Sequence, residues 1–97
     1  MITHSVFFKL KFPKGSSEET TFLSAAARLS TLPRVINFAT LKQTSTKNDF
    51  DYGLTMEFEN QEDYDGYNIH SEHVRFVDTY WEAYVEKFME IDYEVIG

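Results

Sequence analysis

The sequence predicts an α+β fold in which strands and helices follow one another in the order β-α-β-β-α-β. Two kinds of pattern support this prediction. Four segments are extended in character, and in three of them apolar and polar residues alternate, which is typical of strands with one buried face. After the first and the third of these segments, apolar residues instead recur at the three- and four-residue spacing of amphipathic helices.

The first strand is predicted over residues 2–12. Its odd positions are mostly polar, and all but one of its even positions are apolar, namely Ile2, Val6, Phe8, Leu10 and Phe12. The exception is His4. Because side chains two apart on a strand share a face, we expect His4 on the buried side of the sheet.

The first helix is predicted over residues 17–32. Turn-forming residues precede it in "PKGSS" (13–17), and Ser16 with Glu19 has the spacing of a capping box. Apolar residues then recur at helical spacing at Phe22, Ala25, Ala26, Leu29 and Leu32. Pro33 should end the helix because proline lacks an amide hydrogen and crowds the preceding turn.

Two further strands are predicted over residues 35–44 and 52–59. Between them lies the polar segment "STKND" (45–49), whose composition is typical of a hairpin loop. We therefore expect these strands to be antiparallel neighbours.

A second helical region and a last strand complete the chain. Asn60 can cap a short helix through Tyr67, and Ser71 can cap a longer one. The longer helix has a predicted apolar stripe of Val74, Val77, Trp81, Tyr84 and Phe88. The final strand is predicted in "MEIDYEVI" (89–96), where apolar and acidic residues alternate.

These elements in this order predict a ferredoxin-like arrangement, a four-stranded antiparallel sheet with helices on one face. The other face must then meet solvent or a second subunit. Phe7 and Lys9 of the first strand are mixed enough in character to fit an interface there.

Composition limits the classes of partner. The 97 residues suit one domain, residues 1–97, and the net charge of −7 argues against binding to nucleic acid. The absence of cysteine excludes disulfides and thiolate nucleophiles. The first residues alternate in polarity, so we expect no signal peptide and no membrane span. A soluble, cytoplasmic protein is the expectation.

The segment "YNIHSEHVRF" (67–76) contains two histidines three residues apart. On a helix, His70 and His73 could supply two nitrogen ligands to a metal, but a site needs at least one more. Their spacing differs from that of the helical two-histidine zinc motif, and no cysteine is available. We therefore expect no metal and no cofactor.

A proton-transfer pocket is the alternative interpretation of these histidines. Ser71 as cap would place His73 in the first helical turn, where the helix dipole disfavours a charged imidazole. If His73 and His4 face one pocket, it holds two groups that titrate near neutral pH. Asp92 and Tyr67 are candidates to orient the His73 ring or to hold a substrate oxygen. Each of the four residues could instead have an ordinary structural role.

The sequence resembles the stress-responsive A/B barrel (Dabb) family over nearly its full length. The matching segments are "THSVFFKLK", "YNIHSEHVRF" and "EKFMEIDYEV". The H-P-x-H signature of the family appears as residues 70–73 with Ser71 in place of proline, so the turn before the helix is less constrained. The resemblance implies a homodimer, in which two ferredoxin-like protomers pair sheet to sheet into an α/β barrel.

The chain is also similar in design to plant olivetolic acid cyclase, a polyketide cyclase that closes a ring by an aldol step with a histidine base. This resemblance implies His73 as the catalytic base, His4 as the strand histidine, Tyr67 as the pocket tyrosine and Asp92 as the late aspartate. Two hypotheses follow. One is a cofactor-free cyclase or isomerase of a small carbonyl compound, and the other is a non-catalytic stress-related or ligand-binding dimer.

Overall fold

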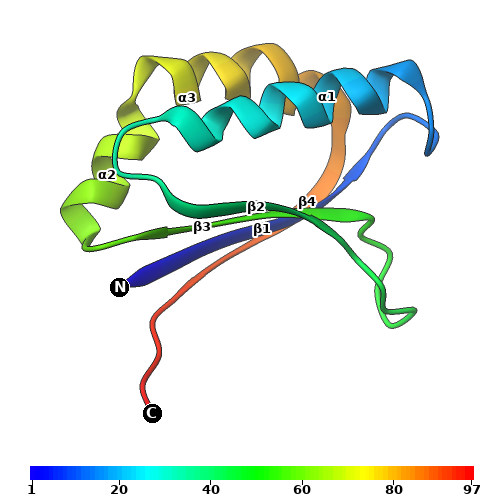
Figure 1. Ribbon diagram of the computed structural model, residues 1–97. Helices are drawn as coiled ribbons and strands as arrows, with labels where there is room; N and C mark the ends of the chain where they lie inside the picture. The colour runs from blue at the N-terminus through cyan, green and yellow to red at the C-terminus, as the bar shows by residue number, and fades with distance from the viewer.

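The computed structural model describes all 97 residues and has the predicted order of strands and helices. One antiparallel sheet has the strand order β2-β3-β1-β4 (Figure 1). Its strands are β1 (Ile2–Leu10), β2 (Ile36–Lys42), β3 (Tyr52–Phe58) and β4 (Val85–Tyr93). The helical segments are α1 (Ser17–Ala27), the 3-10 turn η1 (Arg28–Thr31), α2 (Gln61–Ile69), α3 (Ser71–Phe76), the π-helical turn η2 (Val77–Trp81) and α4 (Glu82–Tyr84). The predicted ferredoxin-like fold is confirmed.

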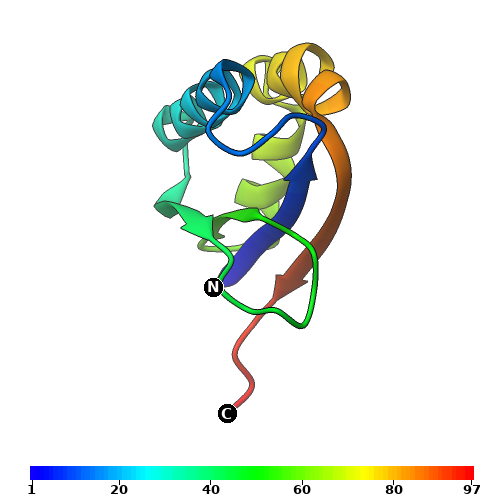
Figure 2. The same cartoon turned by 90° about the vertical axis from the view of Figure 1, so that its right-hand side faces the viewer.

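The helices cover one face of the sheet, with α1 and α3 side by side above it (Figure 1, Figure 2). The alternation predicted for β1 is confirmed, because its even residues are buried beneath the helices and His4 is only 7 % exposed. Two apolar clusters fill the space between the layers. The larger lies around Phe8, Phe22 and Leu54, and the smaller, beside α2, around Met56 and Phe58.

The start of α1 is as predicted, but its end is not. Ser16 caps the helix by accepting a hydrogen bond from the backbone N–H of Glu19 at 3.2 Å. The α-helix then ends at Ala27, and the 3-10 turn η1 continues only to Thr31, short of the predicted residue 32. Within this turn the Thr31 hydroxyl donates to the carbonyl of Arg28 at 2.8 Å, which favours the tighter winding.

The predicted hairpin of β2 and β3 is confirmed, with residues 43–51 as its loop. The register shifts between Ile36 and Ala39, and Asn37 within this irregularity has a positive φ of 52°. The Asn37 side chain donates a hydrogen bond to the Glu57 carboxylate at 2.6 Å. Asparagine adopts a positive φ more readily than most residues, which explains why it suits this position of the bulge.

The region after β3 differs from the prediction at the second cap. Asn60 caps α2 as predicted, accepting from the N–H of Asp63 at 2.9 Å, but the helix runs to Ile69. The cap of α3 is His70 rather than Ser71, because its Nδ1 accepts the N–H of Glu72 at 3.1 Å. An imidazole nitrogen here replaces the hydroxyl that the sequence pattern suggested.

The predicted apolar stripe is only partly correct. Val77, Trp81 and Tyr84 pack against the larger cluster as predicted, whereas Val74 is 44 % exposed and Phe88 lies in β4. The inward face instead begins with His73 and the buried Phe76, one helical turn apart.

Strand β4 begins at Val85, four residues before the predicted start at 89, and ends at Tyr93. In the register of β4 with β1, Asp92 lies opposite His4 and Glu90 lies opposite Val6. Because His4 and Val6 face the helices, both acidic residues lie on the helix-covered face of the sheet. The alternate residues Met89, Ile91 and Tyr93 lie on the uncovered face and are each about half exposed.

The uncovered face of the sheet is largely apolar near its centre. Phe7 lies between Met89 of β4 and Gly53 of β3, and its ring fills the space that a side chain at position 53 would occupy. A Cβ atom at Gly53 would lie 2.7 Å from a carbon of that ring. None of the helices combines the length and the apolar character needed to cross a membrane.

Candidate active site

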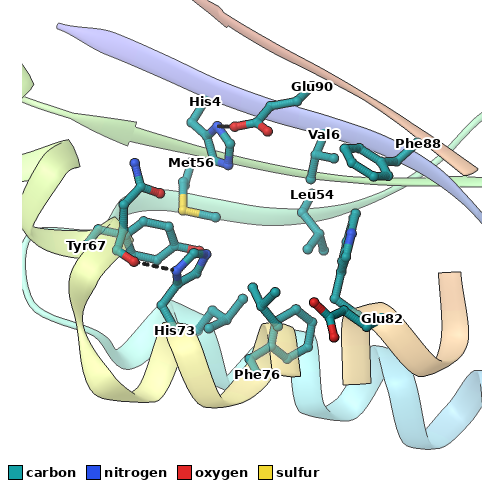
Figure 3. Close-up of a pocket in the computed structure, with 14 residues that line it drawn as sticks. His4, Val6, Leu54, Met56, Tyr67, His73, Phe76, Glu82, Phe88 and Glu90 are labelled. Carbon is teal, nitrogen blue, oxygen red and sulfur yellow. Dashed lines mark hydrogen bonds and ion pairs between the residues drawn. The ribbon is translucent and has the colours of Figure 1, made fainter. Parts of the chain in front are cut away.

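A pocket of about 410 Å³ lies between the sheet and the helices and is lined by members of both apolar clusters (Figure 3). Strands β1 and β3 contribute His4, Val6, Leu54 and Met56, and the helical layer contributes Tyr67, His73, Phe76 and Trp81. Phe88 and Glu90 of β4 lie at one side. Most of its wall is apolar or aromatic; Tyr67, Asn68 and Glu90 lie near the two histidines, and Glu82 lies apart from them beside Phe76 (Figure 3).

His4 is held by carboxylates at one nitrogen. Its Nδ1 lies 2.5 Å from Oδ1 of Asp92 and 3.6 Å from Oε1 of Glu90. Because ionised carboxylates only accept hydrogen bonds, Nδ1 carries the proton that is donated to Asp92. The other ring nitrogen, Nε2, points toward the centre of the pocket in Figure 3. It can therefore accept a hydrogen bond from a ligand when the ring is neutral.

Tyr64 completes the hydrogen bonding around His4. Its hydroxyl lies 2.9 Å from Nδ1 of His4, 2.8 Å from Oδ2 of Asp92 and 3.2 Å from Oε1 of Glu90. Burial, followed by the hydrogen bond to Asp92 and the charges of both carboxylates, raises the pKa of Tyr64 well above its ordinary value. The hydroxyl thus stays protonated and joins the two carboxylates to the histidine.

His73 has a different partner. Its Nδ1 lies 3.0 Å from the backbone carbonyl oxygen of Asn68, which can only accept, so Nδ1 carries the proton. Burial lowers the pKa of His73, and the nearby His4 and His70 add to this effect, while the Asn68 carbonyl and Glu90 oppose it. The ring is therefore neutral at physiological pH, with a lone pair on Nε2. A neutral imidazole in a pocket is able to act as a base.

Tyr67 lies between the two histidines. Its ring centroid is 4.4 Å from that of His73 and 6.3 Å from that of His4, and the residue is only 3 % exposed. Burial and the charge of Glu90 raise its pKa, with no hydrogen bond contributing to the shift. Its hydroxyl is therefore protonated and available to donate a hydrogen bond to a ligand.

Three of the four predicted site residues line one pocket, since His4, Tyr67 and His73 all do so. Asp92, the fourth, does not line the pocket. It forms a hydrogen bond with His4 and does not contact His73, because the register of β1 and β4 places Asp92 opposite His4. It is therefore wrong that Asp92 orients the His73 ring. His70 lies outside the pocket, where it caps α3.

Tyr64 and Glu90 were missed by the sequence analysis. Tyr64 precedes Tyr67 by three residues, the spacing that places two side chains on one helix face, and that spacing could have indicated it. Glu90 shares the face of Asp92 by the period of a strand. Neither pattern reveals that both side chains meet at His4, which depends on the pairing of β1 with β4.

The two histidines of the helical motif each use Nδ1 in a hydrogen bond within the chain. His70 uses its Nδ1 as a helix cap, and His73 donates from its Nδ1 to Asn68. A different group has metal-ligand spacing: one atom each of His4, Glu90 and Asp92 lie within 4.8 Å of one another. These atoms are already joined by the Tyr64 hydroxyl and the His4 proton, so the hydrogen-bonded network accounts for their closeness.

A model of the family described as the stress responsive A/B barrel domain (Dabb) matches residues 2–95. A Dabb family protein with a ferredoxin-like fold from Mesorhizobium loti is 45 % identical, with a TM-score of 0.96, covering 99 % of this chain and 97 % of that one. No curated protein matches the sequence.

Two more distant structures show the same fold. A dimeric ferredoxin-like protein of unknown function from Thermobifida fusca is 12 % identical, with a TM-score of 0.80, covering 97 % of this chain and 90 % of that one. Hydroxynitrile lyase from Passiflora edulis is 14 % identical, with a TM-score of 0.85, covering 98 % of this chain and 93 % of that one.

Proposed function

This chain belongs to the stress-responsive A/B barrel domain family, and we propose that it is a homodimer that catalyses cofactor-free proton transfer. Its substrate is a small, largely apolar carbonyl compound bound in the pocket, and the reaction is a cyclisation or an isomerisation. The observation that carries this proposal is the meeting of a neutral His73, the Tyr67 hydroxyl and His4 in one apolar pocket. The whole chain, residues 1–97, acts as a single domain.

His73 is the base in this mechanism. Its Nε2 takes a proton from a carbon next to the substrate carbonyl, the C–H electron pair moves into a carbon–carbon double bond, and the carbonyl oxygen becomes an enolate. The Nδ1–H of the resulting imidazolium still donates to the Asn68 carbonyl, so the ring keeps its position. The proton then returns to another carbon in an isomerisation, or to the new alkoxide after an aldol ring closure.

Tyr67 and His4 act on the substrate oxygen. The Tyr67 hydroxyl is protonated and donates to the carbonyl oxygen, where negative charge develops as the proton leaves. His4 Nε2 can donate to the same oxygen when that ring is protonated. The carboxylate of Asp92 and the Tyr64 hydroxyl keep the His4 ring oriented, so Asp92 is a positioning residue for His4.

The character of the pocket and the resemblance to known enzymes support this reaction class. Val6, Leu54, Met56, Phe76 and Trp81 suit an apolar ligand and lower the local dielectric constant, which strengthens hydrogen bonds to a developing oxyanion. The Passiflora edulis protein with this fold is a lyase, so the fold supports enzymes. The similarity of residues His4, Tyr67, His73 and Asp92 to plant olivetolic acid cyclase supports ring closure as one form of the reaction.

The homodimer is supported by the uncovered face of the sheet. Phe7, Met89, Ile91 and Tyr93 present an apolar surface there, and a second copy would remove it from water. The Thermobifida fusca protein of the same fold is dimeric. A sheet-to-sheet pair would give the dimeric α/β barrel.

The test is exchange of the carbon-bound α-protons of phenylacetone with deuterium in D₂O, followed by proton NMR. This ketone has an apolar ring and acidic α-protons but no other reactive group. We expect the protein to accelerate exchange, and His73→Asn to reduce the acceleration by at least about a hundredfold, the usual contribution of a general base. His70→Asn is the matched control, because asparagine also caps helices and the residue lies outside the pocket.

Phenylacetone that binds without faster exchange would instead assign the alternative function, a non-catalytic ligand-binding dimer. Equal rates for the two variants would also remove His73 from the mechanism. Binding is measured in the same samples from the line broadening of the ligand resonances.

A further inference from the structure

Apart from the two histidines, the ionised residues that line the pocket are acidic. Its lining includes the carboxylates of Glu82 and Glu90, and contains no lysine or arginine. Glu90, whose side chain is 47 % exposed, pairs with the buried Val6 of β1 on the helix-covered face. Figure 3 shows its carboxylate turned to the His4 ring.

Two contacts hold the Glu90 carboxylate at the His4 end of the pocket. Its Oε1 lies 3.6 Å from Nδ1 of His4 and accepts a hydrogen bond from the Tyr64 hydroxyl at 3.2 Å. Asp92 lies beside it on the same imidazole nitrogen. This corner therefore has two carboxylates and one histidine, so it keeps a net negative charge even when His4 is fully protonated.

No cation in the chain neutralises this corner. Lys87 and Lys14 are paired with Asp49 and Asp51, and Arg75 is paired with Glu72 on its own helix. His73, on the other side of the pocket, is neutral at physiological pH. The chain as a whole has a net charge of −7, so its long-range field has the same sign.

The apolar walls make this charge effective. Tyr67, Phe76, Trp81 and Phe88 line the space where a ligand would lie and lower its local dielectric constant. An anionic group entering the pocket would lose hydration and meet the like charge of Glu90, with no lysine or arginine in the lining to compensate.

We propose that Glu90 is a specificity-determining residue, and that the pocket takes carbonyl compounds without a carboxylate or phosphate group. A neutral ligand avoids the repulsion, and a ligand with a protonated amine near Glu90 gains an ion pair. This inference rests on the proposed function, in that the pocket must bind a carbonyl compound, and it narrows the substrate class to uncharged or cationic molecules.

Three ligands of the same shape test it: 4-acetylbenzamide, 4-acetylbenzoate and 4-(aminomethyl)acetophenone, which are neutral, anionic and cationic. Dissociation constants are measured by NMR titration for the unchanged protein and for Glu90→Gln. The control is Glu94→Gln, which removes the same charge beyond the end of β4 and outside the pocket.

We expect the unchanged protein to bind the amide roughly three to ten times more tightly than the carboxylate, as one partly screened charge contact allows. Glu90→Gln should reduce the preference for the amide over the carboxylate at least about twofold, and it should weaken the binding of the amine. Glu94→Gln should change neither the preference nor the binding of the amine. Raising sodium chloride from low to high concentration should also reduce the ratio in the unchanged protein, a result that does not depend on how any variant folds.

Different failures have different meanings. If the amide and the carboxylate bind equally to the unchanged protein, or if Glu90→Gln leaves their ratio unaltered, the selectivity is overturned while the proposed function stands. If none of the three ligands binds, the proposed function fails and this inference fails with it.

Discussion

At the scale of single residues, the two pocket histidines have the same tautomer for different reasons. Nδ1 of His4 donates to a carboxylate, and Nδ1 of His73 donates to a backbone carbonyl, so each ring has Nε2 as its remaining nitrogen. Nδ1 of His4 lies among two carboxylates and the Tyr64 hydroxyl, whereas burial lowers the pKa of His73. This difference suits His4 to holding a substrate oxygen and His73 to removing a proton.

Tyr64→Phe tests the network around His4, because it removes only the hydroxyl that joins His4 to the two carboxylates. We expect the free energy of unfolding to fall by about 1–3 kcal/mol, since buried partners lose a hydrogen bond. Denaturant unfolding measures this. Tyr80→Phe is the control: that hydroxyl is in a half-buried residue outside the pocket, and its removal should cost about 0.5 kcal/mol or less.

The lowered pKa of His73 is a second prediction at this scale. Burial favours the neutral ring, so in a ¹H–¹⁵N NMR titration His73 should become protonated only below the ordinary value of 6.5. In the unfolded chain the same ring takes up its proton nearer 6.5, so this residue contributes stability above that pH and loses it as pH falls through the folded pKa. A His73 that titrates above 6.5 would contradict the burial described here.

At the scale of elements, most of the fold was predictable because short-range patterns set it. The period of two in β1, the Ser16 cap and the Asn60 cap are local features, and all three were predicted correctly. The predicted end of α1 and start of β4 are wrong by a few residues, and the larger error lies at the junction of α2 with α3, where a histidine replaces the usual capping residue and a π-helical turn follows. Capping by an imidazole and the roll of a short helix depend on tertiary packing.

The dependence on tertiary packing also explains how much of the candidate site could be predicted from the sequence. The resemblance and the motif identified His4, Tyr67 and His73, which do line one pocket. The partner of Asp92 was not predictable, because the register of β1 against β4 decides which histidine it meets. Tyr64 and Glu90 have no motif of their own and become visible only when that register brings them to His4.

Two glycine substitutions make a matched test of the sheet. In Gly53→Ala the new Cβ would lie 2.7 and 2.9 Å from Phe7 ring atoms, so that ring must move on the uncovered face. We expect a loss of about 1–3 kcal/mol of stability. In Gly66→Ala nothing lies within 4 Å of the new atom, and α2 should gain up to about 1 kcal/mol from helix propensity. Thermal unfolding compares the two, and a stabilising Gly53→Ala would contradict the contact.

At the scale of the whole molecule, the protomer is small and leaves one sheet face without a helical cover (Figure 2). The apolar residues on this face are about half exposed in the single chain, although the sheet has a well-filled core on its other side. A partner subunit on this face would therefore complete the fold, and we expect folding and dimerisation to be coupled.

Ile91→Lys tests that coupling, because it places a charge on the uncovered face where β4 pairs with β1. Sedimentation at micromolar concentration should show loss of the dimer, together with a large drop in melting temperature. Ile69→Lys introduces the same charge at an isoleucine that is 80 % exposed at the end of α2, and it should leave both properties unchanged. A stable folded monomer of the unchanged protein would refute the homodimer.

The central claim is that His73 is the base of the pocket, and the pH dependence of α-proton exchange in phenylacetone tests it most directly. Because the reactive form is the neutral ring and burial lowers its pKa, the protein-catalysed rate should be constant around neutral pH and should fall only below 6.5. His73→Asn should abolish this pH-dependent rate. A catalysed rate that falls with a midpoint above 6.5, or that persists in His73→Asn, would contradict the account.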